Sequence, residues 1–272
     1  MYVFGLGHKS LQKLDLVSMQ WTEGTSPLFK GSHQAAVVVG DELYSIGGFD
    51  GAEGVLQWYS QREDTWYVGP NLPYGQAGSV QAAKISQKRI LACGGQIQYQ
   101  GNTRECAIYD TVDRKWVRAQ RMLVALNHAA CGSWNDKVYI FGGRTVSSNS
   151  PAPGVDLVQI YNAKRDRWSY GNPMPFPRSG MGHAPLFEGH LWVIGGETSN
   201  GAVDKFKTND NVFTQVYGFN LKTGRWRQAA DMPIGLHGMF PVADERRNRI
   251  IVAGGGKKQG KSYSNKVLVL QH

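Results

Sequence analysis

A glycine-rich basic segment near the C-terminus carries the most specific chemical pattern in this sequence. Residues Gly255 to Ser262, with the sequence GGKKQGKS, satisfy the pattern GxxxxGK[ST]. Such a loop cradles phosphate only where a helix follows the lysine and aims its N-terminus at the anion. Here Asn265–Leu270 follows, and its β-branched and leucine residues predict a strand. We therefore expect no nucleotide hydrolysis, and interpret the loop as a group of cations that can contact an anionic ligand: Lys257, Lys258 and Lys261.

Histidines and other polar residues recur at equivalent places in the chain, just before short strand-like segments. One aligned position holds His33, Ser79, His128 and Met181, and a second position, three residues earlier, holds Lys30, Gln76 and Arg178; His237 lies close to these positions in the last repeat. Imidazole rings are common metal ligands. However, His33 and His128 belong to non-adjacent repeats, and no acidic residue recurs beside them. We predict hydrogen-bonded histidines and no metal site, with Lys30 and Arg178 as contacts for anions.

Charge and cysteine content narrow the classes of function. The formal charge is +9, but the basic residues are dispersed, which argues against nucleic acid as a partner and favours an acidic peptide or glycan. No apolar stretch reaches the roughly 18–20 residues that a membrane span needs. Cys93, Cys106 and Cys131 cannot all pair and have no CxxC spacing, which favours a reducing, cytoplasmic location.

The elements that must position these residues are repeats. Six short apolar runs end in a glycine doublet or a degenerate form of it, at Gly5-Leu6, Gly47-Gly48, Gly94-Gly95, Gly142-Gly143, Gly195-Gly196 and Gly254-Gly255. After each of the first five, an aromatic residue or leucine precedes a tryptophan by seven residues, in the pairs Leu14/Trp21, Tyr59/Trp66, Tyr109/Trp116, Tyr161/Trp168 and Phe219/Trp226. Within one repeat the pattern predicts four antiparallel strands, which we call a, b, c and d in chain order. One such sheet cannot bury both faces, so the copies must pack against one another.

The loop between strands b and c is the variable part of the repeat. The step from the first glycine to the residue that precedes the tryptophan grows from 9 residues (Gly5 to Leu14) to 24 residues (Gly195 to Phe219). The a–b and c–d turns hardly vary. In an antiparallel meander the b–c loops and the d–a connections lie at the same end of the sheet, so we expect function on that face. The long loops are 144–155, 197–212 and 256–265.

The glycine doublet followed by an aromatic residue and a tryptophan seven residues later is similar to the repeat of kelch β-propellers, and the similarity covers essentially the whole chain. The resemblance implies an all-β propeller of six four-stranded blades, in which the doublet ends strand b and the aromatic pair packs between blades. It places the blades at 1–27, 28–73, 74–122, 123–175, 176–233 and 234–272, within one domain. Leu6, Leu14 and Leu270 depart from the pattern, so the first and last blades are atypical.

The first blade is expected to lack strand a and the last blade to lack strand d. No tryptophan follows Leu270 at the seven-residue step, and Met1 already falls in strand b. Kelch propellers commonly close by taking the outer strand of the last blade from N-terminal chain. We therefore expect that roughly 20–25 residues precede this sequence in the natural protein, judged from the repeat length; a complete protein with an open blade is the alternative.

The resemblance admits enzymes as well as binding proteins. Some members are copper-radical sugar oxidases, sialic-acid mutarotases or iron-assisted specifier proteins. The Tyr-His pair of the oxidases and the Glu-x3-Asp-x3-His set of the specifier proteins are absent, and no short mutarotase motif can be tested. We predict a non-catalytic interaction platform, with a sugar-active enzyme or carbohydrate-binding module as the alternative. The predicted ligand-binding residues are Lys30, His33, Gln76, His128, Arg144, Arg178, Glu197, His237, Lys257, Lys258 and Lys261, with no catalytic residue, metal or other cofactor.

Overall fold

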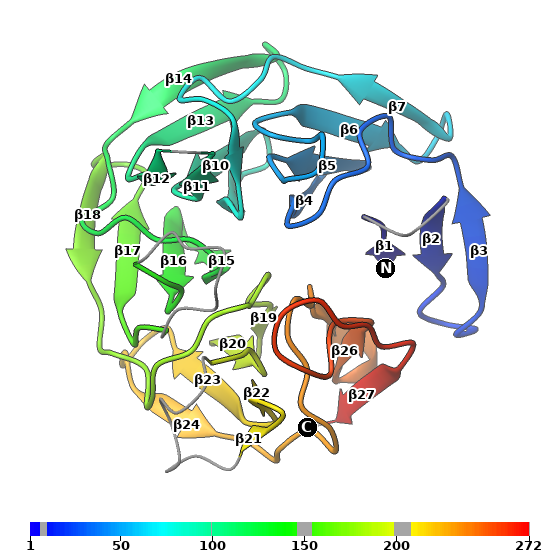
Figure 1. Ribbon diagram of the computed structural model, residues 1–272, viewed down its shortest axis with the longest axis vertical. Coiled ribbons are helices and arrows are strands. Elements are labelled where there is room, and N and C mark those ends of the chain that lie inside the picture. Colours follow the sequence, from blue (N-terminus) through cyan, green and yellow to red (C-terminus); the bar gives the residue numbers. More distant parts are fainter. Residues whose placement is uncertain (6–9, 99, 146–153, 199–207, 272) are drawn as a thin grey trace.

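Six antiparallel sheets lie in chain order around a common centre, with the first strand of each sheet nearest that centre (Figure 1). The structure is a computed structural model, which describes residues 1–5, 10–98, 100–145, 154–198 and 208–271. Four blades have four strands, whereas the first and the last have three. Among the described residues, blade 1 has no strand a and blade 6 has no strand d, which is what the repeat pattern predicts. No helix in the described ranges is long and apolar enough to cross a membrane.

The strands follow the repeat pattern closely. Blade 1 contains β1 (Tyr2–Val3), β2 (Leu11–Leu14) and β3 (Trp21–Gly24), and blade 2 contains β4 (Ala35–Val39), β5 (Glu42–Ile46), β6 (Leu56–Ser60) and β7 (Thr65–Val68). Blade 3 contains β9 (Gln81–Ser86), β10 (Arg89–Cys93), β13 (Cys106–Asp110) and β14 (Lys115–Ala119), and blade 4 contains β15 (Ala130–Trp134), β16 (Lys137–Phe141), β17 (Val158–Asn162) and β18 (Arg167–Tyr170). Blade 5 contains β19 (Leu186–Phe187), β20 (His190–Ile194), β23 (Val216–Asn220) and β24 (Trp226–Gln228), and blade 6 contains β25 (Val242–Asp244), β26 (Arg249–Ala253) and β27 (Val267–Gln271). The remaining elements are the short strands β8 (Ala77–Gly78), β11 (Gln96–Ile97), β12 (Gly101–Asn102), β21 (Thr208–Asn209) and β22 (Val212–Phe213), and a 3₁₀ turn, η1 (Glu245–Arg247).

The invariant seven-residue step has a simple structural cause. Its two residues are direct cross-strand partners in the c–d hairpin, as in Tyr59 opposite Trp66 and Tyr161 opposite Trp168. Their rings are in contact, with centroids 5.5 Å and 5.2 Å apart. Cross-strand aromatic pairs stabilise a sheet by direct contact. The spacing is constant because the c–d turn has a fixed length, whereas the b–c loop does not enter this pairing.

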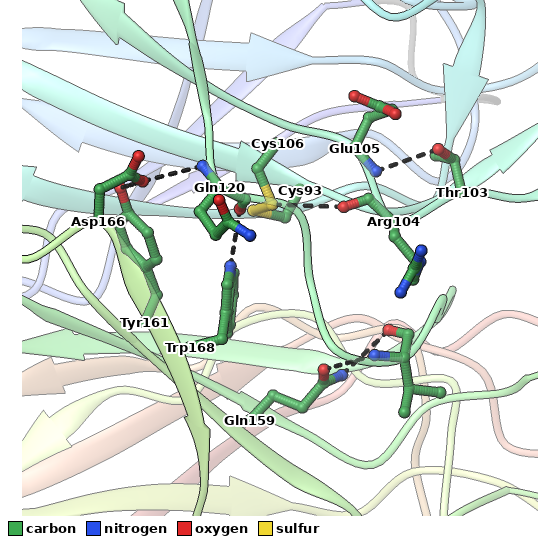
Figure 2. Close-up of a disulfide and its surroundings, with 11 residues drawn as sticks. Cys93, Thr103, Arg104, Glu105, Cys106, Gln120, Gln159, Tyr161, Asp166 and Trp168 are labelled. Carbon is green, nitrogen blue, oxygen red and sulfur yellow. Dashed lines mark hydrogen bonds between the residues drawn. A yellow bond between two sulfur atoms is a disulfide. The ribbon is translucent and has the colours of Figure 1, made fainter.

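The repeat tryptophans of blades 2 to 5 also tie each blade to the preceding one. Trp168 Nε1 donates a hydrogen bond of 2.8 Å to the Gln120 carbonyl oxygen, in the connection that leaves blade 3 (Figure 2). The equivalent bonds run from Trp66 to Thr25, from Trp116 to Pro70 and from Trp226 to Asn172. The expected packing of the aromatic pair between blades is therefore present, and it includes a polar contact that satisfies the indole N–H.

The glycine doublets are required by the close approach of the next blade. Gly142 and Gly143 have φ values of 64° and 94°, which only glycine adopts without strain. A Cβ atom on Gly142 would lie 2.5 Å from the Arg178 carbonyl oxygen of blade 5. The Gly143 N–H donates to that same carbonyl. The doublet thus ends strand b and lets the neighbouring backbone hydrogen-bond to it.

Two inner strands are shorter than the repeat pattern predicts. The innermost strand of blade 6, which the repeat spacing places over 237–243, forms only over Val242–Asp244, and that of blade 5 has only two residues, Leu186–Phe187. A proline directly precedes each strand, Pro241 in blade 6 and Pro185 in blade 5. Proline has no N–H to donate to a ladder, so pairing begins after it.

Blades 1 and 6 touch through one arginine. Arg249 of β26 donates from Nη2 to the Leu16 carbonyl oxygen in the c–d turn of blade 1. Its Nε also donates to Asp244 Oδ2 at 3.0 Å, which fixes the guanidinium. The first and last blades are therefore neighbours in space, as Figure 1 also shows.

Two of the cysteines are bonded, which the sequence pattern did not predict. Cys93 and Cys106 face each other across β10 and β13 and form a disulfide, while Cys131 is free and buried (Figure 2). Disulfides persist mainly in oxidising compartments. The bond therefore removes the support that the cysteine pattern gave to a reducing, cytoplasmic location.

A histidine next to blade 4 makes stability depend on pH. His183 pairs with Cys131 of β15, and burial lowers its pKa to about 4. In the unfolded chain the His183 imidazole binds a proton below about pH 6.5, whereas in the folded protein it does so only near pH 4. The folded state is therefore fully stable at pH 7 and loses stability as the pH falls from 6.5 towards 4. We expect a decrease of up to about 3 kcal/mol in the free energy of unfolding across this range, at about 1.4 kcal/mol per pH unit. Urea unfolding at pH 7, 5.5 and 4.5 measures it, and an equal slope in the His183→Gln variant would contradict it.

Candidate functional site

Blades 2 to 6 each contribute the same two backbone positions to the centre of the b–c face. The residue after each glycine doublet pairs with a residue in the d–a connection, as in Arg144 with Asn127 and Glu197 with Ser179. The next residue of the connection is left-handed in every such blade, namely His33, Ser79, His128, Gly180 and Gly238. These pairings explain how residues far apart in the sequence reach the axis: strand b ends there, and strand a of the same blade begins there.

The structure brings five of the predicted ligand-binding residues together on this face: His33, His128, Arg144, Glu197 and His237. His33 and His128 lie in ring contact, with centroids 4.9 Å apart, although they belong to blades 2 and 4. The sequence analysis counted their position in non-adjacent repeats against a metal site, but the first strands of the blades converge on the axis, so this separation along the chain does not keep the two rings apart. The described residues nevertheless contain no group of three or more acidic, histidine or cysteine side chains placed to hold a metal ion.

Glu197 is the centre of the charged part of this cluster. Its Oε1 accepts a hydrogen bond from Arg144 Nη2, and its Oε2 accepts one of 2.9 Å from the Gly260 backbone N–H. His237 Nδ1 lies 3.8 Å from Oε2. The Glu197 residue is only 3% exposed, and Arg144 is held further by a bond of 2.9 Å from its Nε to Ser179 Oγ. A buried carboxylate is stable only with such compensation, so Glu197 joins blades 4, 5 and 6.

The loop that has the phosphate-loop pattern binds a carboxylate of the protein itself, that of Glu197. The Gly260 amide, which would face phosphate in a nucleotide-binding loop, binds Glu197, and the Lys258 and Gln259 amides donate to Ser262 Oγ and the Asp210 carbonyl. His237 Nε2 lies 2.9 Å from the Lys258 carbonyl oxygen. Strand β27 follows the loop, as expected, and no helix does. The loop is thus fixed by backbone contacts, while three lysine side chains stay exposed: Lys257, Lys258 and Lys261.

Arg178 differs from its expected place on the exposed rim. It is completely buried, its Nη1 donates to the Gly195 and Gln215 carbonyl oxygens, and its guanidinium lies 4.1 Å from the Phe176 ring centroid. The Arg178 carbonyl oxygen accepts a hydrogen bond from the second glycine of the doublet in blade 4. In other blades the residue with this role is apolar, namely Ala77, Leu126 or Leu236. The sequence alignment was therefore one residue out of register in blade 5, where Gly180, and not Met181, is the left-handed residue. Arg178 serves the packing of blade 5 and does not face a ligand on the rim.

The remaining predicted residues lie on exposed parts of the d–a connections. Lys30 and Gln76 are exposed, outside the central cluster. Parts of the two longest b–c loops, 146–153 and 199–207, and Leu6 of the degenerate doublet lie outside the described residues. Three further polar residues beside this cluster were not predicted from the sequence: Asn102, Asn127 and Ser179. Ser179 accepts a hydrogen bond from Arg144, and Asn127 contacts both His128 and Asn102. Their signal was weak, since one polar residue before a left-handed position is common in any turn.

Comparison with known proteins agrees with the repeat pattern. The kelch motif matches residues 30–73 and 125–175. Kelch-like protein terF of Aspergillus terreus is 26% identical over 96% of this chain and 57% of its own length, and human Kelch-like protein 23 is 27% identical over 80% of this chain and 36% of its own length. The chain thus spans only part of these relatives.

A solved structure supports the fold independently. The structure titled "Structure of YjhT" matches 89% of this chain and 82% of its own chain, with a TM-score of 0.72 and 17% identity. This likeness bears on the fold alone. From its repeats, its blades and its relatives, the chain is a β-propeller built from kelch repeats.

Proposed function

We propose that this propeller is an interaction platform that binds an acidic partner, a peptide or a glycan, on the face that carries the b–c loops. The observation that carries the proposal is the loop 256–265, which presents three lysines on a backbone held by Glu197, His237 and Asp210. A preorganised loop loses little conformational entropy when it binds. Its cations therefore meet an anionic ligand without first becoming ordered.

The same loop offers an aromatic contact beside the charges. Tyr263 is 81% exposed, the largest exposed fraction among the large hydrophobic residues of the described ranges. Tyrosine and positively charged residues are typical of binding surfaces, because a flat ring adds contact area at little entropic cost. The net charge of +9 draws acidic molecules towards the protein as a whole. Charge and aromatic contact together favour an acidic peptide over a simple anion.

Removal of the loop charges is expected to weaken binding without unfolding the protein. The variant Lys257→Ala/Lys258→Ala/Lys261→Ala should bind a fluorescent hexaglutamate peptide, or a sulfated oligosaccharide, at least about tenfold more weakly, because each good contact to a charged group contributes about 1–3 kcal/mol. All three side chains are exposed, so the melting temperature should stay unchanged. Binding should also weaken with added salt, which screens exposed charges over about 8–10 Å. Fluorescence anisotropy at 50 and 300 mM salt measures both effects.

A charge-matched control separates this face from general attraction. Lys88, Lys115 and Lys222 lie in or beside the a–b and c–d turns, at the other end of the sheets, and are exposed. Their triple alanine variant carries the same net charge as the loop variant. If the two triple variants lose affinity equally, the proposed face is wrong and the binding is nonspecific.

A further inference from the structure

Three residues with side chains adopt a left-handed backbone conformation near the axis, at a position where two other blades have glycine. The left-handed residue of the d–a connection is Gly180 in blade 5 and Gly238 in blade 6, but His33, Ser79 and His128 in blades 2, 3 and 4, with φ values of 55°, 53° and 56°. A residue with a Cβ pays free energy to adopt this conformation. Strain of this kind gathers at functional sites. In blades 2, 3 and 4 a side chain therefore occupies the place that glycine takes in blades 5 and 6.

Two of the three side chains form a nucleophile and base pair. Ser79 Oγ lies 3.3 Å from His128 Nε2, and the two residues come from adjacent blades. The His33 ring packs edge-on against the His128 ring and is itself exposed at the surface of the face. Ser79 is 6% exposed and lies beneath this histidine pair.

A third residue fixes the orientation of the base. Asn127 Nδ2 donates to Asn102 Oδ1 at 2.6 Å, so Asn127 Oδ1 is the atom that faces His128 Nδ1, also at 2.6 Å. Asn102 is held in turn by a bond of 3.0 Å from its Nδ2 to the Arg144 carbonyl oxygen. An acceptor opposite Nδ1 places the proton of neutral His128 there. The lone pair of Nε2 then faces the Ser79 hydroxyl, which is the arrangement of a base that is oriented by a third group.

The surroundings keep this base neutral at physiological pH. Burial lowers the pKa of His128 well below its ordinary value, and the nearby charges of Arg144, His33 and His237 lower it further. Among the groups that face it, Asn127 and Ser79 are uncharged. His33 is also held in one orientation, since Ser32 Oγ donates to Asp50 Oδ2 at 2.6 Å and lies 2.9 Å from His33 Nδ1. A neutral imidazole is able to accept the proton of the serine.

We propose that Ser79, His128 and Asn127 form a nucleophilic site that cleaves a small carboxylic ester on the b–c face near the axis, an activity beyond the binding role. Ser79 Oγ forms a bond to the ester carbonyl carbon while its proton passes to His128 Nε2. The ester C–O bond then breaks, and His128 gives the proton to the departing alkoxide. Water attacks the acylated serine by the same route, which releases the carboxylic acid and restores Ser79. Asn127 is a positioning residue, and the small exposed fraction of Ser79 restricts the substrate to small acyl groups.

Covalent labelling tests the proposal directly. Purified protein is treated with diisopropyl fluorophosphate, and the adduct is located by intact mass and peptide mapping. We expect one adduct, on Ser79, which the Ser79→Ala variant lacks and which forms at least about 100-fold more slowly in His128→Gln. The control variant Ser86→Ala changes the serine that ends β9 in blade 3 and should label like the wild type. No adduct on Ser79 of the wild-type protein, or equal rates with and without His128, would overturn the proposal, whether or not the variants fold.

The pH profile separates a catalytic pair from a structural one. Because His128 is already neutral, the labelling rate should be constant from pH 6 to 8 and fall only in more acidic solution. In the Asn127→Asp variant a carboxylate faces Nδ1 and raises the pKa of His128. The acidic fall should then shift to higher pH, by about one unit or more. An unshifted profile in a folded Asn127→Asp variant would show that Asn127 does not act through His128.

Discussion

Replacement of Trp66 by alanine is expected to lower the free energy of unfolding by about 3–5 kcal/mol, the usual cost of removing a large buried aromatic side chain. Trp66 is 4% exposed and packs against Tyr59 of its own blade and Phe4 of blade 1, with ring centroids 5.5 Å and 5.7 Å away. Its indole also donates to the Thr25 carbonyl at 2.8 Å. The substitution therefore removes the contacts that join blades 1 and 2.

Chemical denaturation followed by circular dichroism measures this loss, and two variants divide it. Trp66→Phe keeps one ring but removes the indole donor and the second ring, so its cost combines the hydrogen bond, worth about 1 kcal/mol, with part of the packing. Trp116→Ala changes an equivalent tryptophan that is only partly buried, and should cost less than Trp66→Ala. A loss below about 1 kcal/mol for Trp66→Ala would mean that the aromatic pairs do not join the blades.

The second large effect is expected at Glu197. In Glu197→Ala, Arg144 remains 9% exposed without its counter-ion, and loss of one partner of a buried pair costs about 3–5 kcal/mol. The Gly260 amide also loses its acceptor, so the loop 256–265 loses one of its contacts with blade 5 and keeps the bond from the Gln259 amide to the Asp210 carbonyl oxygen. We expect a lower free energy of unfolding together with faster hydrogen exchange of the Gly260 amide. The two readouts separate the stability of the ring from the order of the loop.

A double-mutant cycle tests the cause of this effect. If the uncompensated charge of Arg144 produces the cost, Arg144→Met/Glu197→Ala should recover part of the stability that Glu197→Ala loses. Glu188→Ala is the matched control, since that carboxylate is about half exposed and lies 3.9 Å from Arg227, a surface pair expected to contribute little. Equal losses for Glu197→Ala and Glu188→Ala would contradict the central role of Glu197.

The loop contacts also connect stability with the proposed binding role. Glu197 holds the backbone of the loop through Gly260, whereas the lysines of that loop face solvent. Glu197→Ala should therefore weaken binding of an acidic peptide indirectly, through disorder of the loop. The lysine variants should weaken it directly, with hydrogen exchange at Gly260 unchanged.

Local spacing in the sequence determined the blades. The constant step from Tyr59 to Trp66 reports a hairpin with a turn of fixed length, and a doublet such as Gly142-Gly143 reports a place where another backbone approaches closely. Both features belong to a few consecutive residues, so they can be read without knowledge of the rest of the chain. The face that carries the variable loops followed from the same reasoning, because antiparallel strands fix which turns share an end.

The site depended on contacts that local spacing does not contain. Which residues meet at the axis follows from the way six blades converge, so the contact between His33 and His128 and the pairing of Glu197 with Arg144 appear only in the folded ring. A shift of one residue in a connection was enough to move Arg178 from the expected rim to the interior of blade 5, because successive residues there point in different directions. The sequence by itself determined the repeat and the end of the sheets that carries the variable loops, since these rest on short-range hydrogen bonding and packing. Only the tertiary structure decided which polar groups become partners across blades, such as Glu197 with Arg144 and Ser79 with His128.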